Sequence, residues 1–137
     1  MPPRRVSVFF YGLFMDAEAL RAKGAQPAGV HTASVPDFAL RIGRRATLVP
    51  AAGERAYGVV MELTHDEIDR LYADPSVQAY RPEAVLVELP DGTRIPALCY
   101  NLVVPPSADE ANPEYAAKLR DLARRLDLPA DYVARIG

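Results

Sequence analysis

The period of the hydrophobic positions changes along the chain, and each change marks an expected element. β-branched and aromatic residues fill Val6–Tyr11 and predict a buried strand that ends at Gly12. Asp16 can cap a helix that runs to about Lys23, and Gly24 follows as a stop signal. The chain therefore opens as a strand, a tight loop and a short helix.

The following segment is dominated by expected strands. Gly29–Val35 and Phe38–Ile42 predict two strands around a Pro36–Asp37 turn, and Thr47–Val49 predicts a short third one. Arg55–Leu63 is the clearest strand of the region, because apolar residues occupy both of its alternating faces. Both faces of this strand should therefore be covered.

Two local signals punctuate the next segment. Thr64 and Glu67 have the spacing of a capping box and predict a two-turn helix after them. Ala84–Leu89 and Thr93–Val104 predict a hairpin, since Asp91-Gly92 is a typical turn pair between them.

The C-terminal segment reads as helical. Asn112 followed by Pro113 is a helix start, because proline fits the first helical position. Pro129 interrupts the pattern, and Asp131–Ile136 predicts a further short turn of helix. The apolar stripe of the long helix consists of Tyr115, Leu119, Leu122 and Leu126.

Because the expected strands cluster rather than alternate with helices, the order indicates an α+β fold with a mostly antiparallel or mixed sheet. The length of 137 residues is that of one ordinary domain. We expect a single domain over residues 1–137, with its core at about 6–104 and its terminal helices at about 112–136.

Composition and charge narrow the possible classes of function. The apolar fraction is 50%, the charged fraction is 25% and the net charge is −2, as in ordinary globular proteins rather than nucleic-acid-binding ones. The single Cys99 and the distant His31 and His65 give no metal-ligand spacing. No segment is long enough to span a membrane. We expect a cytoplasmic protein with no metal and no cofactor.

Several motifs, taken in order, resemble those of the gamma-glutamylcyclotransferase-like family, which includes AIG2-like proteins. The resemblance covers about residues 6–104 and implies a small mixed β-barrel with helices packed around it. The matching stretches are Val8–Phe14 with its Tyr-Gly pair, Tyr57–Leu63, Ile68–Pro75 followed by Tyr80-Arg81 and a strand to Leu89, and Cys99-Tyr100.

The resemblance also implies a chemistry. In active members the loop that corresponds to Gly12–Met15 holds a gamma-glutamyl group through backbone amides, which suits a loop entering a helix. A glutamate after a Leu-Asp pair shuttles a proton while the substrate's α-amine attacks its γ-carbonyl. The products are 5-oxoproline and a released amine, and the partner is therefore a small gamma-glutamyl amide or a related molecule.

This chain departs from that pattern at the glutamate. Aligning Ile68-Asp69 on the Leu-Asp pair puts Tyr72 in its place, and aligning Leu71-Tyr72 puts Pro75 there with Asp74 beside it. The loop residues Leu13 and Phe14 are also bulkier and more apolar than in well-known members. A phenol with a pKa of about 10 is a poor base at neutral pH.

The candidate residues keep two interpretations each. Tyr72 can face the pocket or the core, and Asp74 can be an acid or a turn residue. Alternation puts Glu83 on the same strand face as Val85, as a displaced acid partnered by Arg81 or as a paired edge carboxylate. Our predicted catalytic residues are Glu83 and Tyr72. The predicted substrate-binding residues are Tyr11, Gly12, Leu13, Phe14, Arg81 and Tyr100.

Three classes of function stay open on this basis. The first is a cyclotransferase on a small gamma-glutamyl amide, with a displaced acid such as Glu83. The second is a non-catalytic relative that binds a small metabolite in the same pocket. The third is an interaction module that uses Arg41, Arg44 and Arg45, although such a cluster near a turn is typical of a solvated loop.

Overall fold

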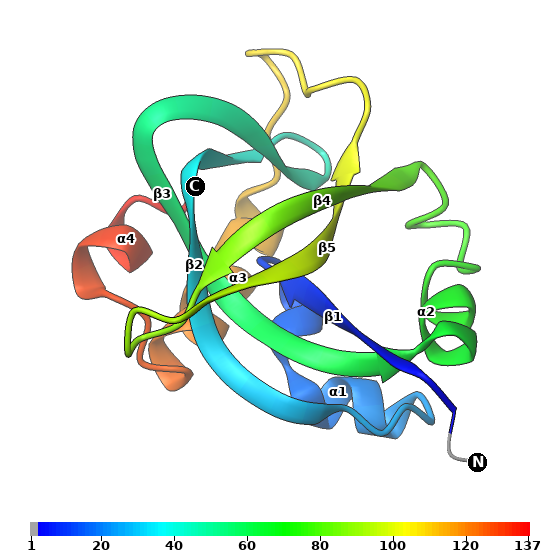
Figure 1. Ribbon diagram of the computed structural model, residues 1–137. Coiled ribbons are helices and arrows are strands. Elements are labelled where there is room, and N and C mark those ends of the chain that lie inside the picture. The colour runs from blue at the N-terminus through cyan, green and yellow to red at the C-terminus, as the bar shows by residue number, and fades with distance from the viewer. Residues whose placement is uncertain (1–2) are drawn as a thin grey trace.

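The structure, a computed structural model, describes residues 3–137 as a closed five-stranded β-barrel with helices around its outside (Figure 1). Residues 1 and 2 of the predicted domain lie outside the described residues. The strands are β1 (Arg5–Phe10), β2 (Ala28–Ile42), β3 (Ala46–Thr64), β4 (Tyr80–Glu88) and β5 (Arg94–Leu102). The helices are α1 (Ala17–Ala22), α2 (His65–Leu71), α3 (Pro113–Arg125) and α4 (Ala130–Ala134), and Leu13–Met15 forms the 3₁₀ turn η1.

The strand order around the barrel is β1-β3-β2-β4-β5. The pairs β1–β3, β2–β3, β2–β4 and β4–β5 are antiparallel, whereas β1 runs parallel to β5 through Val8 and Leu98. The first strand of the sequence therefore closes the barrel between β3 and β5. This architecture confirms the expected α+β fold with a mixed barrel.

The C-terminal half of β1 is buried on both faces, because one face lies inside the barrel and the other against the helices. Phe9 and Tyr11 belong to the core inside the barrel, whereas Val8 and Phe10 belong to the core between the barrel and the helices. Gly58 lets β3 approach β1 closely, because a Cβ atom there would lie 2.1 Å from the carbonyl oxygen of Phe10. The end of β1 is thus held between two hydrophobic cores, one inside the barrel and one between the barrel and the helices.

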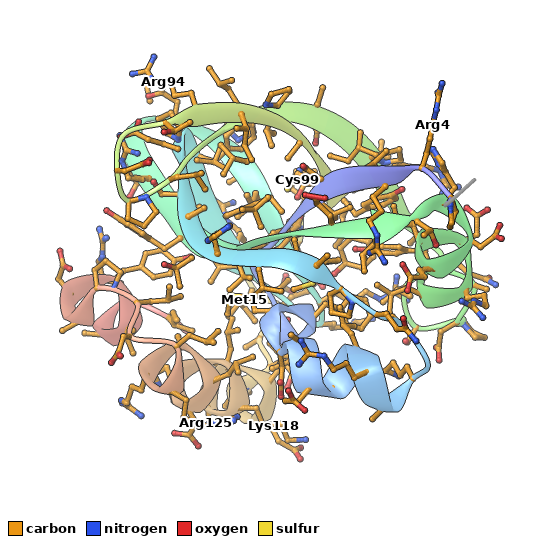
Figure 2. The ribbon with its side chains drawn as sticks, turned by 60° about the horizontal axis from the view of Figure 1, so that its bottom comes forward. Arg4, Met15, Arg94, Cys99, Lys118 and Arg125 are labelled. Atoms are coloured by element: carbon orange, nitrogen blue, oxygen red, sulfur yellow. The ribbon has the colours of Figure 1, made fainter. Side chains whose placement is uncertain are left out.

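The helices begin where the sequence predicts. The side chain of Asp16 accepts hydrogen bonds from two backbone N–H groups of α1, and Thr64 with Glu67 forms the full capping box of α2. Asn112 caps α3, with Pro113 at its first turn. Figure 2 shows Met15 between the barrel and α3, and Lys118 and Arg125 on the outward side of that helix.

Two of the strand boundaries expected from sequence are wrong. The stretch 28–42 is one strand rather than two, because Asp37 adopts a φ of 64° as a bulge and its carboxylate accepts a hydrogen bond from Gly53 N–H across the pair. Residues 46–64 likewise form one strand, since β3 pairs with β2 along its length. A bulge bends the pair without interrupting it, and the resulting long hairpin carries the turn Gly43–Arg45 to one end of the barrel.

Candidate functional site

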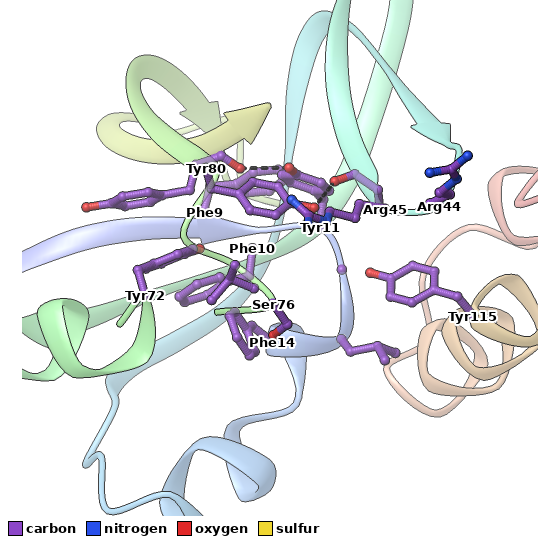
Figure 3. A pocket seen from close by; sticks show the side chains of 15 residues that line it. Phe9, Phe10, Tyr11, Phe14, Arg44, Arg45, Tyr72, Ser76, Tyr80 and Tyr115 are labelled. Carbon is purple, nitrogen blue, oxygen red and sulfur yellow. Dashed lines mark hydrogen bonds between the residues drawn. The ribbon is translucent and has the colours of Figure 1, made fainter. Parts of the chain in front are cut away.

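A cavity of about 310 Å³ opens at the end of β1, beside the loop that leads into η1 (Figure 3). Its wall draws on several separate parts of the chain. The lining residues are Phe9, Phe10, Tyr11, Gly12, Leu13, Phe14, Arg44, Arg45, Ala46, Tyr72, Ser76, Val77, Tyr80, Tyr100 and Tyr115.

The loop at the end of β1 is anchored to β5. The hydroxyl of Tyr11 donates a hydrogen bond of 2.7 Å to the backbone oxygen of Tyr100, and only 6% of Tyr11 is exposed. Burial raises the pKa of Tyr11 well above its ordinary value. Tyr11 therefore stays protonated and holds the loop in place.

A set of aromatic rings forms one wall. Tyr72 stacks on Tyr100, with ring centroids 4.1 Å apart, and Phe14 meets Tyr72 edge-on at 5.9 Å. Tyr80 lies at 6.4 Å from Tyr72. Burial raises the pKa of Tyr72 far above neutrality and that of Tyr80 to about 12. These phenols are hydrogen-bond donors at neutral pH and cannot serve as bases.

The turn between β2 and β3 brings two arginines to the cavity. The N–H of Gly43 donates to the backbone oxygen of Arg45, which closes the turn. Glu110 accepts from the N–H of Arg44 at 3.3 Å, and the side-chain amide of Asn112 donates to the oxygen of Arg44 at 3.1 Å. The segment before α3 therefore fixes a turn that is far from it in sequence.

Tyr115 reaches the same loop from α3. Its hydroxyl is so close to Gly12 that a Cβ atom there would lie 2.5 Å from it. Burial raises the pKa of Tyr115, so its hydroxyl stays protonated beside Gly12.

Six of the eight residues named from the sequence lie at the cavity: Tyr11, Gly12, Leu13, Phe14, Tyr72 and Tyr100. Their role in binding stays a prediction. Sequence reasoning did not assign Arg44, Arg45, Tyr80 and Tyr115 to the pocket. The arginine cluster was the one available signal, and we interpreted it as a solvated loop or an interaction surface.

The expectation that Glu83 and Arg81 lie at this pocket is wrong. The carboxylate of Glu83 accepts a hydrogen bond of 2.9 Å from the side-chain amide of Asn101, which is 2% exposed. Arg81 is exposed and donates to the backbone oxygens of Gln78 and Tyr80. Both residues belong to β4, and neither lines the cavity.

Asp74 makes the contacts of a turn residue. Its carboxylate accepts hydrogen bonds from both the backbone N–H and the hydroxyl of Ser76, at 2.9 and 2.7 Å. The lining residue at this point is therefore Ser76 rather than the acid beside it.

The charged side chains that line the cavity carry positive charge. Among residues 3–137, the cavity is lined by two arginines and by no aspartate, glutamate or histidine. The same range has no cluster of three His, Cys, Asp or Glu side chains that could hold a metal ion. The arrangement can bind an anion and pack against apolar groups, but it offers no side chain to accept a proton at neutral pH.

The helices give no sign of a membrane span. None of those described within residues 3–137 combines the length and the apolar character that crossing a bilayer requires.

Solved structures share this fold. One titled gamma-glutamyl cyclotransferase superposes with a TM-score of 0.81 at 21% identity, covering 97% of this chain and 86% of that one. Uncharacterized protein loc79017 from Homo sapiens gives a TM-score of 0.79 at 22% identity, with 96% and 86% covered. An aig2-like protein from Mus musculus gives 0.57 at 16% identity, with 81% and 90% covered. At these identities the likeness concerns the fold alone.

Sequence comparison identifies the family. No curated protein matches this sequence. The family model described as "Gamma-glutamyl cyclotransferase, AIG2-like" matches residues 8–119, which span the barrel and the first half of α3. This chain therefore belongs to the gamma-glutamyl cyclotransferase, AIG2-like family.

Proposed function

We propose that this protein binds a small molecule in the cavity at the Tyr11-Gly12 loop and does not convert gamma-glutamyl amines to 5-oxoproline. The single observation that carries the proposal is the composition of the cavity wall, which contains no carboxylate and no imidazole among the described residues. The ligand-binding residues would be Tyr11, Gly12, Leu13, Phe14, Tyr72 and Tyr100, joined by Arg45.

Lactam formation requires a proton acceptor. The α-amine of a gamma-glutamyl compound is an ammonium ion at neutral pH, so it must lose a proton before it can attack the γ-carbonyl. A positioned acid or base accelerates such a step by about a hundred- to ten-thousand-fold. Tyr72 and Tyr80 are held protonated by burial, and an arginine does not release its proton in proteins.

The binding half of the proposal depends on other features. Aromatic rings and a tight loop enclose the cavity, as is common in small-molecule sites, which are mostly apolar with a few convergent polar groups. Binding depends on this enclosure alone, whereas lactam formation would need a proton acceptor as well. The loss of the acceptor therefore leaves binding intact.

The test measures release of 5-oxoproline from gamma-glutamyl amines and gamma-glutamyl amino acids by mass spectrometry, with an active cyclotransferase as a positive control. We expect no release above the uncatalysed rate. A parallel NMR titration with the same gamma-glutamyl compounds should place ligand-induced shifts at Gly12, Leu13 and Tyr100. Glu83→Gln is the matched control, because Glu83 lies outside the cavity and its loss should leave the titration unchanged. Saturable turnover would overturn the proposal.

A further inference from the structure

Two like charges line the cavity, and no acidic side chain of the described residues lines it with them. Arg44 and Arg45 are its only charged lining residues among residues 3–137. In Figure 3, Arg45 extends toward Tyr11, whereas Arg44 lies farther out, toward the C-terminal helices. Burial raises the pKa of Tyr80 to about 12, and the charge of Arg45 acts against that rise.

Within the part of the chain that the structure describes, Arg45 forms no ion pair with an acidic side chain. The ion pairs within residues 3–137 engage other arginines and Lys118, and none includes Arg44 or Arg45. The contact of Arg44 with Glu110 is made by its backbone N–H and not by its side chain. Of the two arginines, Arg45 is the one whose side chain extends toward the tyrosines (Figure 3).

The position of Arg45 is fixed through its backbone. Its turn is closed by the hydrogen bond from Gly43, and its neighbour Arg44 is held on both backbone groups by Glu110 and Asn112. A charge carried by a clamped turn loses less freedom on binding than one on a mobile loop. The guanidinium group also offers two parallel donors to a carboxylate.

Opposite this charge, the cavity is aromatic. Eight of its fifteen lining residues are Phe or Tyr, so a ligand that fills it must present an apolar or aromatic body. The flat stack of Tyr72 on Tyr100 forms part of that wall.

We propose that the ligand is an amphipathic organic anion without an ammonium group, with its carboxylate on Arg45 and its apolar or aromatic body against Tyr72 and Tyr100. This inference rests on the proposed function, since it names the class of molecule that the same cavity takes. An α-ammonium group would meet Arg45 with no carboxylate to neutralise it. The site therefore selects against amino acids, including gamma-glutamyl compounds, relative to simple carboxylic acids.

Three probes of similar shape separate the effect of the carboxylate from that of the ammonium group. 3-Phenylpropionate is an anion, 3-phenylpropionamide is its neutral amide, and phenylalanine adds an α-ammonium group. Isothermal titration of the wild-type protein at low salt should rank the anion tightest and phenylalanine weakest. Because Arg45 is exposed, the step from amide to anion should be about one and a half- to fivefold, as for an ion pair near the surface.

Substitutions at Arg45 test whether this residue binds the carboxylate. Arg45→Gln should bring the anion and the amide to equal affinity, and Arg45→Lys should keep part of the preference. Arg41→Gln is the matched control, since Arg41 is exposed, belongs to the same cluster and does not line the cavity, so it should leave the ranking unchanged. Unchanged preference in Arg45→Gln would overturn the assignment.

The two proposals fail in different ways. Equal or tighter binding of the amide or of phenylalanine overturns the anion inference and leaves the proposed function standing. The same conclusion follows if a gamma-glutamyl amine binds without turnover while none of the three probes binds. Turnover to 5-oxoproline overturns the proposed function instead. Absence of binding by every probe and every gamma-glutamyl compound overturns both.

Discussion

Tyr72, at the C-terminal cap of α2, lies nearly flat on Tyr100 of β5, with ring planes inclined by 16° and centroids 4.1 Å apart. In one alignment with the family, Tyr72 occupies the position of the glutamate. Tyr72 thus contributes an aromatic wall to the cavity and fastens the end of α2 to the barrel.

The stack predicts a contrast between two substitutions at Tyr72. Tyr72→Ala removes a largely buried ring and should lower the free energy of unfolding by about 2–4 kcal/mol. Tyr72→Phe retains the ring and should change it by less than about 1 kcal/mol. Urea unfolding followed by circular dichroism measures both. Equal losses in the two variants would show that the hydroxyl, and not the stack, stabilises this region.

A second prediction concerns Gly12 and Tyr115. The backbone of Gly12 has a φ of −108°, which any residue adopts, so Gly12→Ala acts only through contact with the Tyr115 hydroxyl. We expect a loss of about 1–3 kcal/mol for this overpacking.

The matched background for that test is Tyr115→Phe. Without the hydroxyl, the nearest Tyr115 atom to a new Cβ would be Cζ at 3.9 Å, an ordinary contact. The same Gly12→Ala change should then cost less than about 0.5 kcal/mol, which gives a clear coupling in the double-mutant cycle. Additive losses would place the Tyr115 hydroxyl elsewhere than at the loop.

Glu67 predicts a pH dependence of stability. Burial alone would raise the pKa of this carboxyl, which is 8% exposed, but hydrogen bonds from the backbone N–H groups of Thr64 and Gln26 lower it overall. Because its pKa in the folded state is below that of the unfolded chain, the stabilisation is present above the unfolded pKa. It is lost as the pH falls through the folded pKa.

Glu67→Gln tests this sign. At pH 7 the variant should be less stable by about 1–3 kcal/mol, since an amide can accept only one of the two N–H groups. The difference from wild type should shrink as the pH falls toward about 3. Glu114→Gln is the control, because Glu114 is exposed on α3 and should show little effect at any pH. A constant difference across pH would contradict the account.

Much of the fold could be predicted because its signals are local. The capping box at Thr64, the Asn112-Pro113 start and the alternation of Arg55–Leu63 depend on neighbouring residues and were confirmed. The strand break expected at Pro36–Asp37 was wrong, because pairing with β3 continues past the bulge. A partner strand distant in sequence outweighed the local turn signal.

The site was less predictable because long-range packing builds it. Arg45 reaches the cavity only because Glu110 and Asn112 clamp its turn, and Tyr115 only because α3 packs beside η1. Alternation placed Glu83 on the correct face of β4, but not at the correct height along the barrel, where Asn101 takes its carboxylate. Periodicity indicates on which face of a strand a side chain lies, but not which residues of other elements lie opposite that side chain.

The most direct test of the central claim is a single-turnover incubation of the wild-type protein, in molar excess over a gamma-glutamyl amine, with the mixture analysed by mass spectrometry. Because no described residue of the cavity can accept the α-amine proton at neutral pH, we predict that the gamma-glutamyl amine is recovered intact. Stoichiometric appearance of 5-oxoproline would contradict the account, and if it were unaffected by Glu83→Gln it would require a proton acceptor within the cavity itself.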